Sequence, residues 1–460
     1  MSWLLSALSG LLLALAFPRS SLAWLAWLAL VPFFYVLLRV RRTKEALLCG
    51  LVFACVFFAI HLAWVLTVFR FVGLWIVLGW LCLTLFQALF ILAFVFLVRK
   101  VPRPGGTFYP VVAALLWTAV EWLRAWGPFG VTGGDLGYSQ AQFLPLIQIA
   151  GFFSVYGVSF LIALVNQGAA LFLFDRKKWS GLALSLVLVL VAVIYGQVEL
   201  SLGRFIPQQP SRFLSLALIQ PNIRQEDKND PKLVAPTFRL QEEMSQQALK
   251  LEPDILIWPE TAVFAYLLDR PALMSRLKQL AAKTRLGLIF GTPYYYQGRA
   301  YNAVVSLSPS GEVTARYDKQ HRVPFGEYLP FRPLLYPWLR RVGYYESDFS
   351  EGRQLSPLRL EGLSIATAVC FESTFPYTIK QRTGPKEDII LLVTNDAWFL
   401  DSSALYFHLN TGVFRAIENR KYFVQAGNTG FSALIDPYGR LLKRSKLQQQ
   451  QILRFQVPLS

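Results

Sequence analysis

Residues 363–373 read LSIATAVCFES, an apolar run that stops at Cys370 and continues with Phe371, Glu372 and Ser373. The run has the length and composition of a buried strand. A strand that ends in a small nucleophile at a tight turn presents that atom to a pocket at the edge of the sheet. A lone cysteine is more often a packing residue, because free cysteine is among the most buried residue types. The motif around Cys370 alone therefore does not indicate catalysis. A catalytic cysteine also requires a base that removes its proton and a donor that stabilises the oxyanion, and both must come from elsewhere in the chain.

Two upstream motifs contain groups of these kinds. Residues 254–261, DILIWPET, form another apolar run, and this one ends in the acid Glu260. Residues 317–330, YDKQHRVPFGEYLP, carry Lys319 and a second acid, Glu327, in a segment whose Pro and Gly residues are typical of a loop. The motifs are far apart in the sequence, so their side chains can meet only through tertiary folding.

The three motifs, in this order, resemble the Glu-Lys-Cys triad of the nitrilase (carbon–nitrogen hydrolase) superfamily. The whole chain resembles the membrane-bound apolipoprotein N-acyltransferase family, to which EWLR at 121–124, LGYSQ at 136–140 and residues 147–162 are also similar. The resemblance implies that Cys370 is the nucleophile, Glu260 the general base and Lys319 the donor that stabilises the oxyanion.

The resemblance also implies supporting residues around the triad. Glu327 corresponds to the second acid of the family, which orients the lysine or carries protons. Phe371 stands where the family often has Tyr, and Glu372 follows it as in the family pattern.

The composition indicates a membrane protein with an attached domain. Hydrophobic residues make up 54% of the 460 residues and charged residues 16%, which is too apolar for a single soluble globule. The net charge of +17 sits largely in short loops beside apolar spans. An anionic lipid surface explains this excess of positive charge better than a nucleic acid does. We therefore expect the protein to contact a lipid bilayer and not to bind a nucleic acid.

Residues 1–199 contain apolar stretches that approach or exceed the roughly 20 residues needed to cross a bilayer. The first stretch lacks a basic leader and is followed by further spans, so it is expected to be a retained helix and not a signal peptide. The seven predicted spans are about 2–17, 21–38, 46–69, 72–98, 108–126, 144–175 and 179–198.

Basic residues cluster after alternate spans. The clusters follow the second, fourth and sixth spans and consist of Arg39, Arg41, Arg42 and Lys44; Arg99, Lys100 and Arg103; and Arg176, Lys177 and Lys178. The positive-inside rule then predicts a cytoplasmic N-terminus and an outer location for everything beyond residue 199. The sequence lacks the further transmembrane helix that many family members carry after the catalytic domain, so the expectation is seven spans and an outer C-terminus.

Glu121 and Arg124 are ionisable residues near the outer end of the fifth predicted span. Such residues are costly inside a membrane and are usually functional or paired. Two interpretations stay open, an interfacial pair beside Trp122 and Trp126 or a catalytic role.

Residues 212–460 alternate strand-like and helix-like runs, with helices expected near 238–250, 273–284 and 406–421. The expected strands are 214–219, 255–258, 286–290, 302–307, 363–369, 389–394, 422–426, 432–435 and 452–457. This alternation indicates layered α/β structure. The resemblance sharpens the fold class to α/β plus an all-α membrane part, that is, a multi-span transmembrane helical bundle (1–199) followed by an αββα nitrilase-like sandwich (212–460).

The resemblance implies an acyltransferase of the bacterial inner (cytoplasmic) membrane, with its catalytic domain facing the periplasm. Cys370 would take an acyl chain from a phospholipid donor as a thioester. It would then pass the chain to the α-amine of the N-terminal diacylglyceryl-cysteine of an apolipoprotein. Residues 328–349 mix bulky apolar residues with arginines, which favours a lid in the phospholipid interface over ordinary core.

Two rival functions stay open. A membrane-tethered amidase of the same superfamily would use the same triad with water as acceptor, and a non-catalytic lipid- or lipoprotein-binding protein would carry a decayed site. No cofactor is expected, and no metal, because His61, His321 and His408 offer no ligand spacing. The four cysteines are expected to be free thiols.

Overall fold

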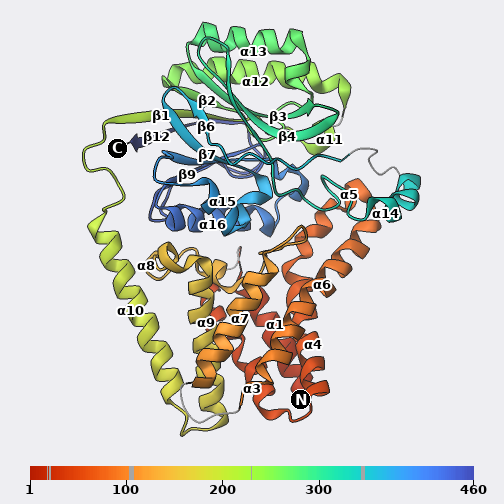
Figure 1. Ribbon diagram of the computed structural model, residues 1–460, viewed down its shortest axis with the longest axis vertical. Helices are drawn as coiled ribbons and strands as arrows, with labels where there is room; N and C mark the ends of the chain where they lie inside the picture. Colours follow the sequence, from red (N-terminus) through yellow and green to blue (C-terminus); the bar gives the residue numbers. More distant parts are fainter. Residues whose placement is uncertain (18, 20–21, 103–107, 229, 343–347, 460) are drawn as a thin grey trace. The chain divides into compact units, whose positions relative to one another are not determined.

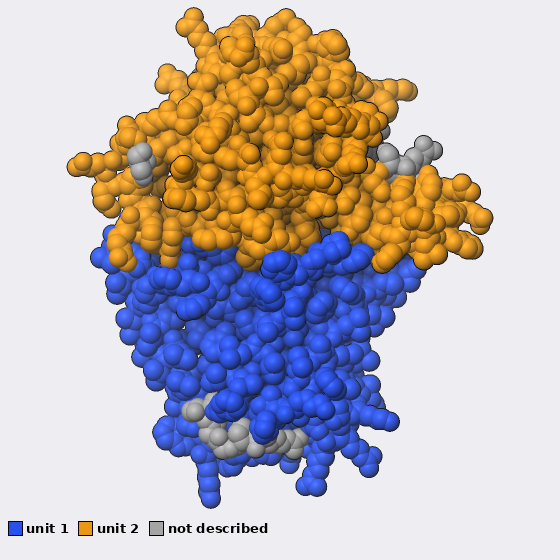
Figure 2. All heavy atoms as spheres, in the orientation of Figure 1, with its two compact units in different colours: residues 1–203, 401–418 blue, residues 204–400, 419–460 orange. Residues whose placement is uncertain are grey.

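The computed structural model describes residues 1–17, 19, 22–102, 108–228, 230–342 and 348–459. The chain forms two compact units, which Figure 2 colours separately. Unit 1 contains residues 1–203 and 401–418, and unit 2 contains residues 204–400 and 419–460. Residues 401–418 lie inside the predicted outer domain, but they pack as part of unit 1.

Unit 1 is helical. Its helices are α1 (Ser2–Leu15), α2 (Ala26–Ala29), α3 (Val31–Arg39), α4 (Thr43–His61), α5 (Phe69–Val72), α6 (Trp75–Val98), α7 (Phe108–Arg124), α8 (Leu144–Ile147), α9 (Ala150–Phe174), α10 (Ser180–Leu202) and most of α16 (Ser403–Asn419). Among the described residues, α4, α6, α9 and α10 are the four helices long and apolar enough to cross a membrane. The other three predicted spans coincide with shorter helices, α1, α2 with α3, and α7, and their crossing stays a prediction.

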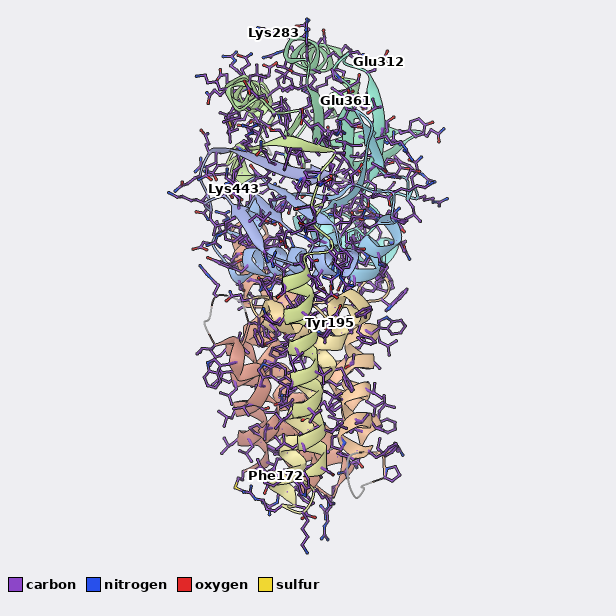
Figure 3. The ribbon with its side chains drawn as sticks, turned by 90° about the vertical axis from the view of Figure 1, so that its left-hand side faces the viewer. Phe172, Tyr195, Lys283, Glu312, Glu361 and Lys443 are labelled. Atoms are coloured by element: carbon purple, nitrogen blue, oxygen red, sulfur yellow. The ribbon has the colours of Figure 1, made fainter. Side chains whose placement is uncertain are left out.

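Helix α10 displays the surface expected of a lipid-facing helix. Leu186, Leu190 and Ile194 are each more than half exposed, and Figure 3 shows α10, on which Tyr195 is labelled, at the front of the view. A contiguous apolar surface of this kind is unfavourable in water and favourable against hydrocarbon.

Glu121 and Arg124 do not form the interfacial pair that was one of the two interpretations. Both side chains are buried, and the ion-pair partner of Arg124 is Asp135. Glu121 instead accepts hydrogen bonds from Trp117 Nε1 (2.8 Å) and from the main-chain N–H of Leu136 (3.0 Å). The chain turns back after α7, so the loop that contains Asp135 supplies partners that sequence proximity did not suggest.

Helix α9 is interrupted at Ser154, where φ is 56° and ψ is −171°. Glu418 covers the break, because its Oε1 accepts from Ser154 Oγ (2.7 Å) and from the main-chain N–H of Val155 (3.0 Å). Arg415 donates to the same carboxylate at 2.7 Å. A carboxylate at this position satisfies a main-chain donor that the break leaves without its helical acceptor.

Unit 2 contains two six-stranded sheets within its described residues, in the orders β12-β1-β2-β3-β4-β5 and β11-β10-β9-β8-β7-β6. The first sheet comprises β1 (Arg212–Gln220), β2 (Ile255–Ile257), β3 (Gly287–Tyr296), β4 (Arg299–Leu307), β5 (Val313–Asp318) and β12 (Gln451–Leu459). The second comprises β6 (Leu358–Leu360), β7 (Leu363–Val369), β8 (Ile389–Thr394), β9 (Tyr422–Gly427), β10 (Ala433–Ile435) and β11 (Leu441–Arg444). Strands β1, β2 and β3 are parallel, and so are β7, β8 and β9.

The alternation of side chains along each strand builds two apolar layers. On β1, Leu216 and Leu218 point into a core that also contains Ile365 and Leu391 of the second sheet. The intervening Ala217 joins the outer layer of the first sheet. Because successive strand residues face opposite sides, an almost continuous apolar run is what a sheet covered on both faces requires.

Helices cover the outer face of each sheet, and Figure 1 shows the two helices α12 and α13 above the first sheet. Helices α12 (Val234–Ala248) and α13 (Pro271–Thr284) pack on the first sheet through Phe238 and Leu277, and α15 (Pro376–Arg382) packs on the second. The remaining unit 2 helices are α11 (Gln225–Lys228) and α14 (Arg332–Leu339). The predicted αββα sandwich after a helical membrane part is therefore confirmed.

Three strands were missed from the sequence, β5, β6 and β11. All four residues of β11 are exposed, β6 has only three residues, and β5 mixes charged and apolar residues. None of them carries the apolar run by which the other strands were predicted.

Candidate active site

Glu260 lies three residues after the end of β2, where the chain packs closely against β3. Trp258 before it is fully buried, and its Nε1 donates to Ser245 Oγ at 2.9 Å. Strand β3 passes so close that a Cβ on Gly291 would lie 2.6 Å from the Cα of Glu260. Glycine at position 291 is thus required for the main chain of Glu260 to lie against β3.

Lys319 follows β5 and points to two acids. Its Nζ lies 2.9 Å from Glu327 Oε1 and 3.8 Å from Glu260 Oε1, and the side chain is 2% exposed. Burial alone would lower the pKa of Lys319, but the carboxylates of Glu327 and Glu260 outweigh it and raise the pKa above its usual value. The lysine is therefore a cation at neutral pH, and the two carboxylates already have their counter-ion.

Asn302, on β4, joins the two acids and was not singled out from the sequence. Its Nδ2 donates to Glu260 Oε1 (2.8 Å) and to Glu327 Oε1 (2.9 Å). The main-chain N–H of Lys319 in turn donates to the Asn302 carbonyl at 2.8 Å. Asn302 thus holds Glu260, Lys319 and Glu327 together. An asparagine at the start of a strand-like run gives no sequence signal for such a role.

Cys370 occupies the turn after β7, with φ at +51°, in the left-handed region that non-glycine residues seldom adopt. This conformation turns the chain sharply at the sulfur and starts a 3-10 turn over Cys370–Thr374. Burial, followed by the charge of Glu260, raises the pKa of the Cys370 thiol well above its usual value, although Lys319 and the Thr394 side chain oppose the shift. The Cys370 side chain is therefore a thiol at rest, which would need a base to act as the predicted nucleophile.

Glu260 has the properties of that base. Burial raises the pKa of its carboxyl group, and Lys319 acts in the opposite direction. Its second oxygen, Oε2, accepts from the main-chain N–H of Asn395 at 2.7 Å. Asn395 follows β8, so a loop of the second sheet also orients the Glu260 carboxyl group.

Glu372 has a different environment from the other acids. It is fully buried, and it accepts from the main-chain N–H groups of Val369 (2.8 Å), Gln320 (2.9 Å) and His321 (3.0 Å). Tyr317 Oη and the Arg382 guanidinium also donate to it. Burial raises the pKa of Glu372, but Arg382 and the main-chain donors overcome this and lower the pKa below its usual value.

Phe371 packs near two other aromatic rings, one just after the turn and one in the segment after β5. Its ring centre lies 5.1 Å from that of Phe375 and 6.1 Å from that of His321. The structure thus brings Glu260, Lys319 and Glu327 together and couples Cys370 electrostatically to Glu260 and Lys319, while Phe371 and Glu372 support the turn.

Segment 328–349, predicted as a lid, has exposed bulky residues in its described part. Phe331, Leu334 and Trp338 are 69%, 69% and 68% exposed, and α14 contains no buried residue. This contradicts the alternative that these residues belong to an ordinary core. Residues 343–347 of the segment lie outside the described residues.

Comparison with known families assigns both parts of the chain. Residues 9–168 match the family described as apolipoprotein N-acyltransferase N-terminal domain. Residues 215–460 match the carbon-nitrogen hydrolase family.

Similar proteins cover nearly the whole chain. An apolipoprotein N-acyltransferase of Geobacter metallireducens is 36% identical over 475 aligned positions, which cover 99% of this chain and 89% of the relative. One from Vibrio cholerae is 30% identical and covers 95% of this chain and 88% of the relative. Among solved structures, a carbon-nitrogen hydrolase from Helicobacter pylori is 14% identical with a TM-score of 0.42 and covers 53% of this chain and 89% of that chain.

The hydrolase match spans more than half of the chain, and the identity to the Geobacter relative extends over almost all of it. The membrane part and the sandwich part match in the order in which they occur in the chain. On these grounds the chain belongs to the apolipoprotein N-acyltransferase family.

Proposed function

We propose that this protein transfers a fatty acyl chain from a membrane phospholipid to the α-amine of the N-terminal diacylglyceryl-cysteine of lipoproteins. The observation that carries the proposal is the joint environment of Glu260, Lys319 and Cys370, three residues from different segments of a chain that belongs to this family. A protonated thiol, a buried carboxylate and a fixed cation are the groups that acyl transfer through a thioester requires.

The first half-reaction forms the acyl-enzyme. Glu260 takes the proton of the Cys370 thiol while the sulfur attacks the ester carbonyl of the phospholipid. Lys319 stabilises the oxyanion of the tetrahedral intermediate, a contribution of about 3 kcal/mol for one well-placed donor. When the intermediate collapses, the lysophospholipid alkoxide leaves with the proton held by Glu260, and Cys370 carries the acyl chain as a thioester.

The second half-reaction transfers the chain. The neutral α-amine of the acceptor attacks the thioester carbonyl, and Lys319 again faces the oxyanion. Glu260 accepts the proton that the amine loses, and the departing thiolate recovers it. The enzyme returns to its starting state, and the product contains an amide in place of the phospholipid ester.

The exposed surface of α14 supports access to a lipid. Phe331, Leu334 and Trp338 provide bulky apolar contacts, and Arg332 and Arg341 lie over the rings of Tyr336 and Trp338. Basic residues interleaved with large apolar side chains suit insertion among phospholipid head groups. We assign this segment as a lid at the lipid interface.

The distribution of basic loops supports a location in the bacterial inner membrane with the catalytic unit on the periplasmic side. Lys and Arg clusters follow alternate predicted spans, whereas residues 127–143 contain neither. A cysteine-reactive label that cannot cross the membrane should therefore reach an introduced cysteine at exposed Lys250 in intact spheroplasts, and not one at exposed Lys44.

The rival function is a membrane-tethered amidase that uses the same triad with water as acceptor. Intact-mass spectrometry of the purified full-length protein with phospholipid, followed by a diacylglyceryl-cysteine peptide, separates the two. The proposal expects an acyl adduct that passes to the peptide amine. An adduct lost only to water would support the amidase.

The matched variants for this experiment are Cys370→Ala and Cys82→Ala. Cys82 is exposed and Cys370 is not, and both are free thiols. C82A should keep the adduct and C370A should abolish it. Absence of an adduct in the folded wild-type protein would favour the binding-protein alternative.

A further inference from the structure

Lys228 is a buried lysine beside the candidate base. It is the last residue of α11, and its side chain is 4% exposed. Lysine is almost never fully buried unless its charge is paired. Here Nζ donates to the main-chain carbonyls of Thr261 (2.9 Å) and Glu260 (3.3 Å), and the carboxylate whose charge acts on it is that of Glu260.

The main chain that Lys228 binds is held on its other side by β3. The N–H of Gly291 donates to the Pro259 carbonyl at 3.3 Å, and the N–H of Ala262 donates to the Gly291 carbonyl at 3.0 Å. Thr261 has a φ of +42°, an unfavourable value for a β-branched residue. A conformation of this kind persists when the surroundings over-determine it, and Lys228 supplies two of the bonds that do so.

The position of Lys228 is itself fixed from the second sheet. Gln225 Oε1 accepts from Asn395 Nδ2 at 2.8 Å. The main chain of Ile223 exchanges two hydrogen bonds with the Asn428 side chain, at 3.0 and 2.7 Å. Residues 223–228 are thus tied to the loops after β8 and β9, while Lys228 reaches the loop after β2 of the first sheet.

We infer that Lys228 is a positioning residue for the proposed acyl transfer, which fixes the main chain of Glu260 and places a positive charge behind its carboxylate. The inference rests on the proposed function only in the role given to Glu260 as the base. The lysine acts through Glu260, and no contact with a substrate is required.

The charge on Lys228 depends on pH in the neutral range. Burial lowers its pKa to about 7, although Glu260 opposes the shift. The groups that act on Glu260 are Lys319, Glu327, the amide of Asn302 and Lys228. Below pH 7 the Lys228 ammonium helps to keep Glu260 ionised, and this help is lost as the pH rises through 7.

The test measures the rate at which iodoacetamide alkylates Cys370 in the full-length protein in detergent, from about pH 5 to about pH 9. Peptide mass spectrometry separates this thiol from the other three. The variants are Lys228→Met, which removes the charge and both hydrogen bonds, and Lys228→Arg, which keeps a permanent charge. Lys232→Met is the matched control, because Lys232 is exposed.

The inference expects K228M to move the acid limb of the profile upward by about one pH unit, a roughly tenfold loss of rate on that limb. K228R and K232M should keep the wild-type acid limb. Loss of the Lys228 charge should also produce a step in the wild-type rate profile near pH 7. This step should persist in K232M and vanish in K228R and K228M. A purely structural lysine would lower the rate by the same factor at every pH, and that result would overturn the inference.

Two further readouts keep the test decisive. If K228M shows no cooperative thermal transition, K228R decides, and a persisting step near pH 7 would overturn the inference. Acyl-enzyme formation from phospholipid is measured on the same preparations. A wild type without an acyl adduct but with the expected K228M shift would refute the proposed function alone, whereas an acylating wild type with an unshifted K228M would refute the role of Lys228 alone.

Discussion

Replacing Asn302 by leucine tests whether its side-chain amide keeps Glu260, the proposed base, ionised. Leucine has a similar volume, so the change removes the Nδ2 bonds to Glu260 and Glu327 without leaving a large cavity. Asn302 is 4% exposed, which leaves little access for water to replace the lost donor. Both carboxylates then keep Lys319 beside them, and Glu260 also keeps its hydrogen bond from the main-chain N–H of Asn395.

The size of the effect follows from the bond to Glu260. A hydrogen bond to an ionised group contributes about 1.5–3 kcal/mol, and one pKa unit corresponds to about 1.4 kcal/mol. Loss of the 2.8 Å bond should therefore raise the pKa of Glu260 by about one to two units beyond the rise that burial already causes. Because the base must be ionised, the rate on the acid limb should fall by roughly tenfold to a hundredfold.

The assay is the rate of acyl-enzyme formation against pH, followed by intact mass in detergent with phospholipid. The matched control is Gln297→Leu, which removes an exposed amide on the hairpin between β3 and β4. Q297L should follow the wild-type profile. A folded N302L protein whose acid limb coincides with that of the wild type would refute the role assigned to Asn302.

Three predictions concern stability, each measured by thermal unfolding in detergent. Arg382→Met leaves the fully buried Glu372 without its cation and should cost about 3–5 kcal/mol, whereas the exposed Arg353→Met should cost little. Glu418→Ala removes the cap on the break in α9 and the carboxylate that pairs with buried Arg415, with a similar expected loss, and Glu45→Ala at an exposed site is its control. Gly137→Ala places a Cβ against the Val155 carbonyl oxygen and should cost about 1–3 kcal/mol, while Gly79→Ala, where nothing lies within 4 Å, should not destabilise. Unchanged midpoints in the test variants would contradict each assignment.

Sequence patterns predicted the parts of the fold that depend on apolar periodicity. The strands around 214–219, 363–369 and 389–394 correspond to β1, β7 and β8, because each is buried on both faces and reads as a continuous apolar run. Strand β11 has four exposed residues and gives no such run. Apolar runs indicate which strands are buried, so buried strands were predicted. They do not indicate which segments pair at the edge of a sheet, so an exposed strand such as β11 was missed.

Only part of the candidate site could be predicted from the sequence. Glu260, Lys319 and Cys370 stand in local motifs that mark them, and their roles remain proposals. Asn302 and Lys228 act through bonds to residues far away in the sequence, so no local pattern identifies them. The partner of Arg124 was missed for the same reason, since Asp135 approaches it only after the chain turns back.

The network around Glu372 explains why a sandwich of apolar strands is not sufficient for this site. Cys370 follows a strand of the second sheet and Lys319 follows a strand of the first, and apolar side chains between sheets tolerate small shifts. Catalytic groups need to be held within about 0.5 Å. Glu372 accepts from Val369, beside the nucleophile, and from Gln320 and His321, beside the lysine. One buried carboxylate therefore fixes the two strand ends relative to each other, with Arg382 balancing its charge. In the proposed mechanism Glu372 then has an orienting role, and proton transfer is assigned to Glu260.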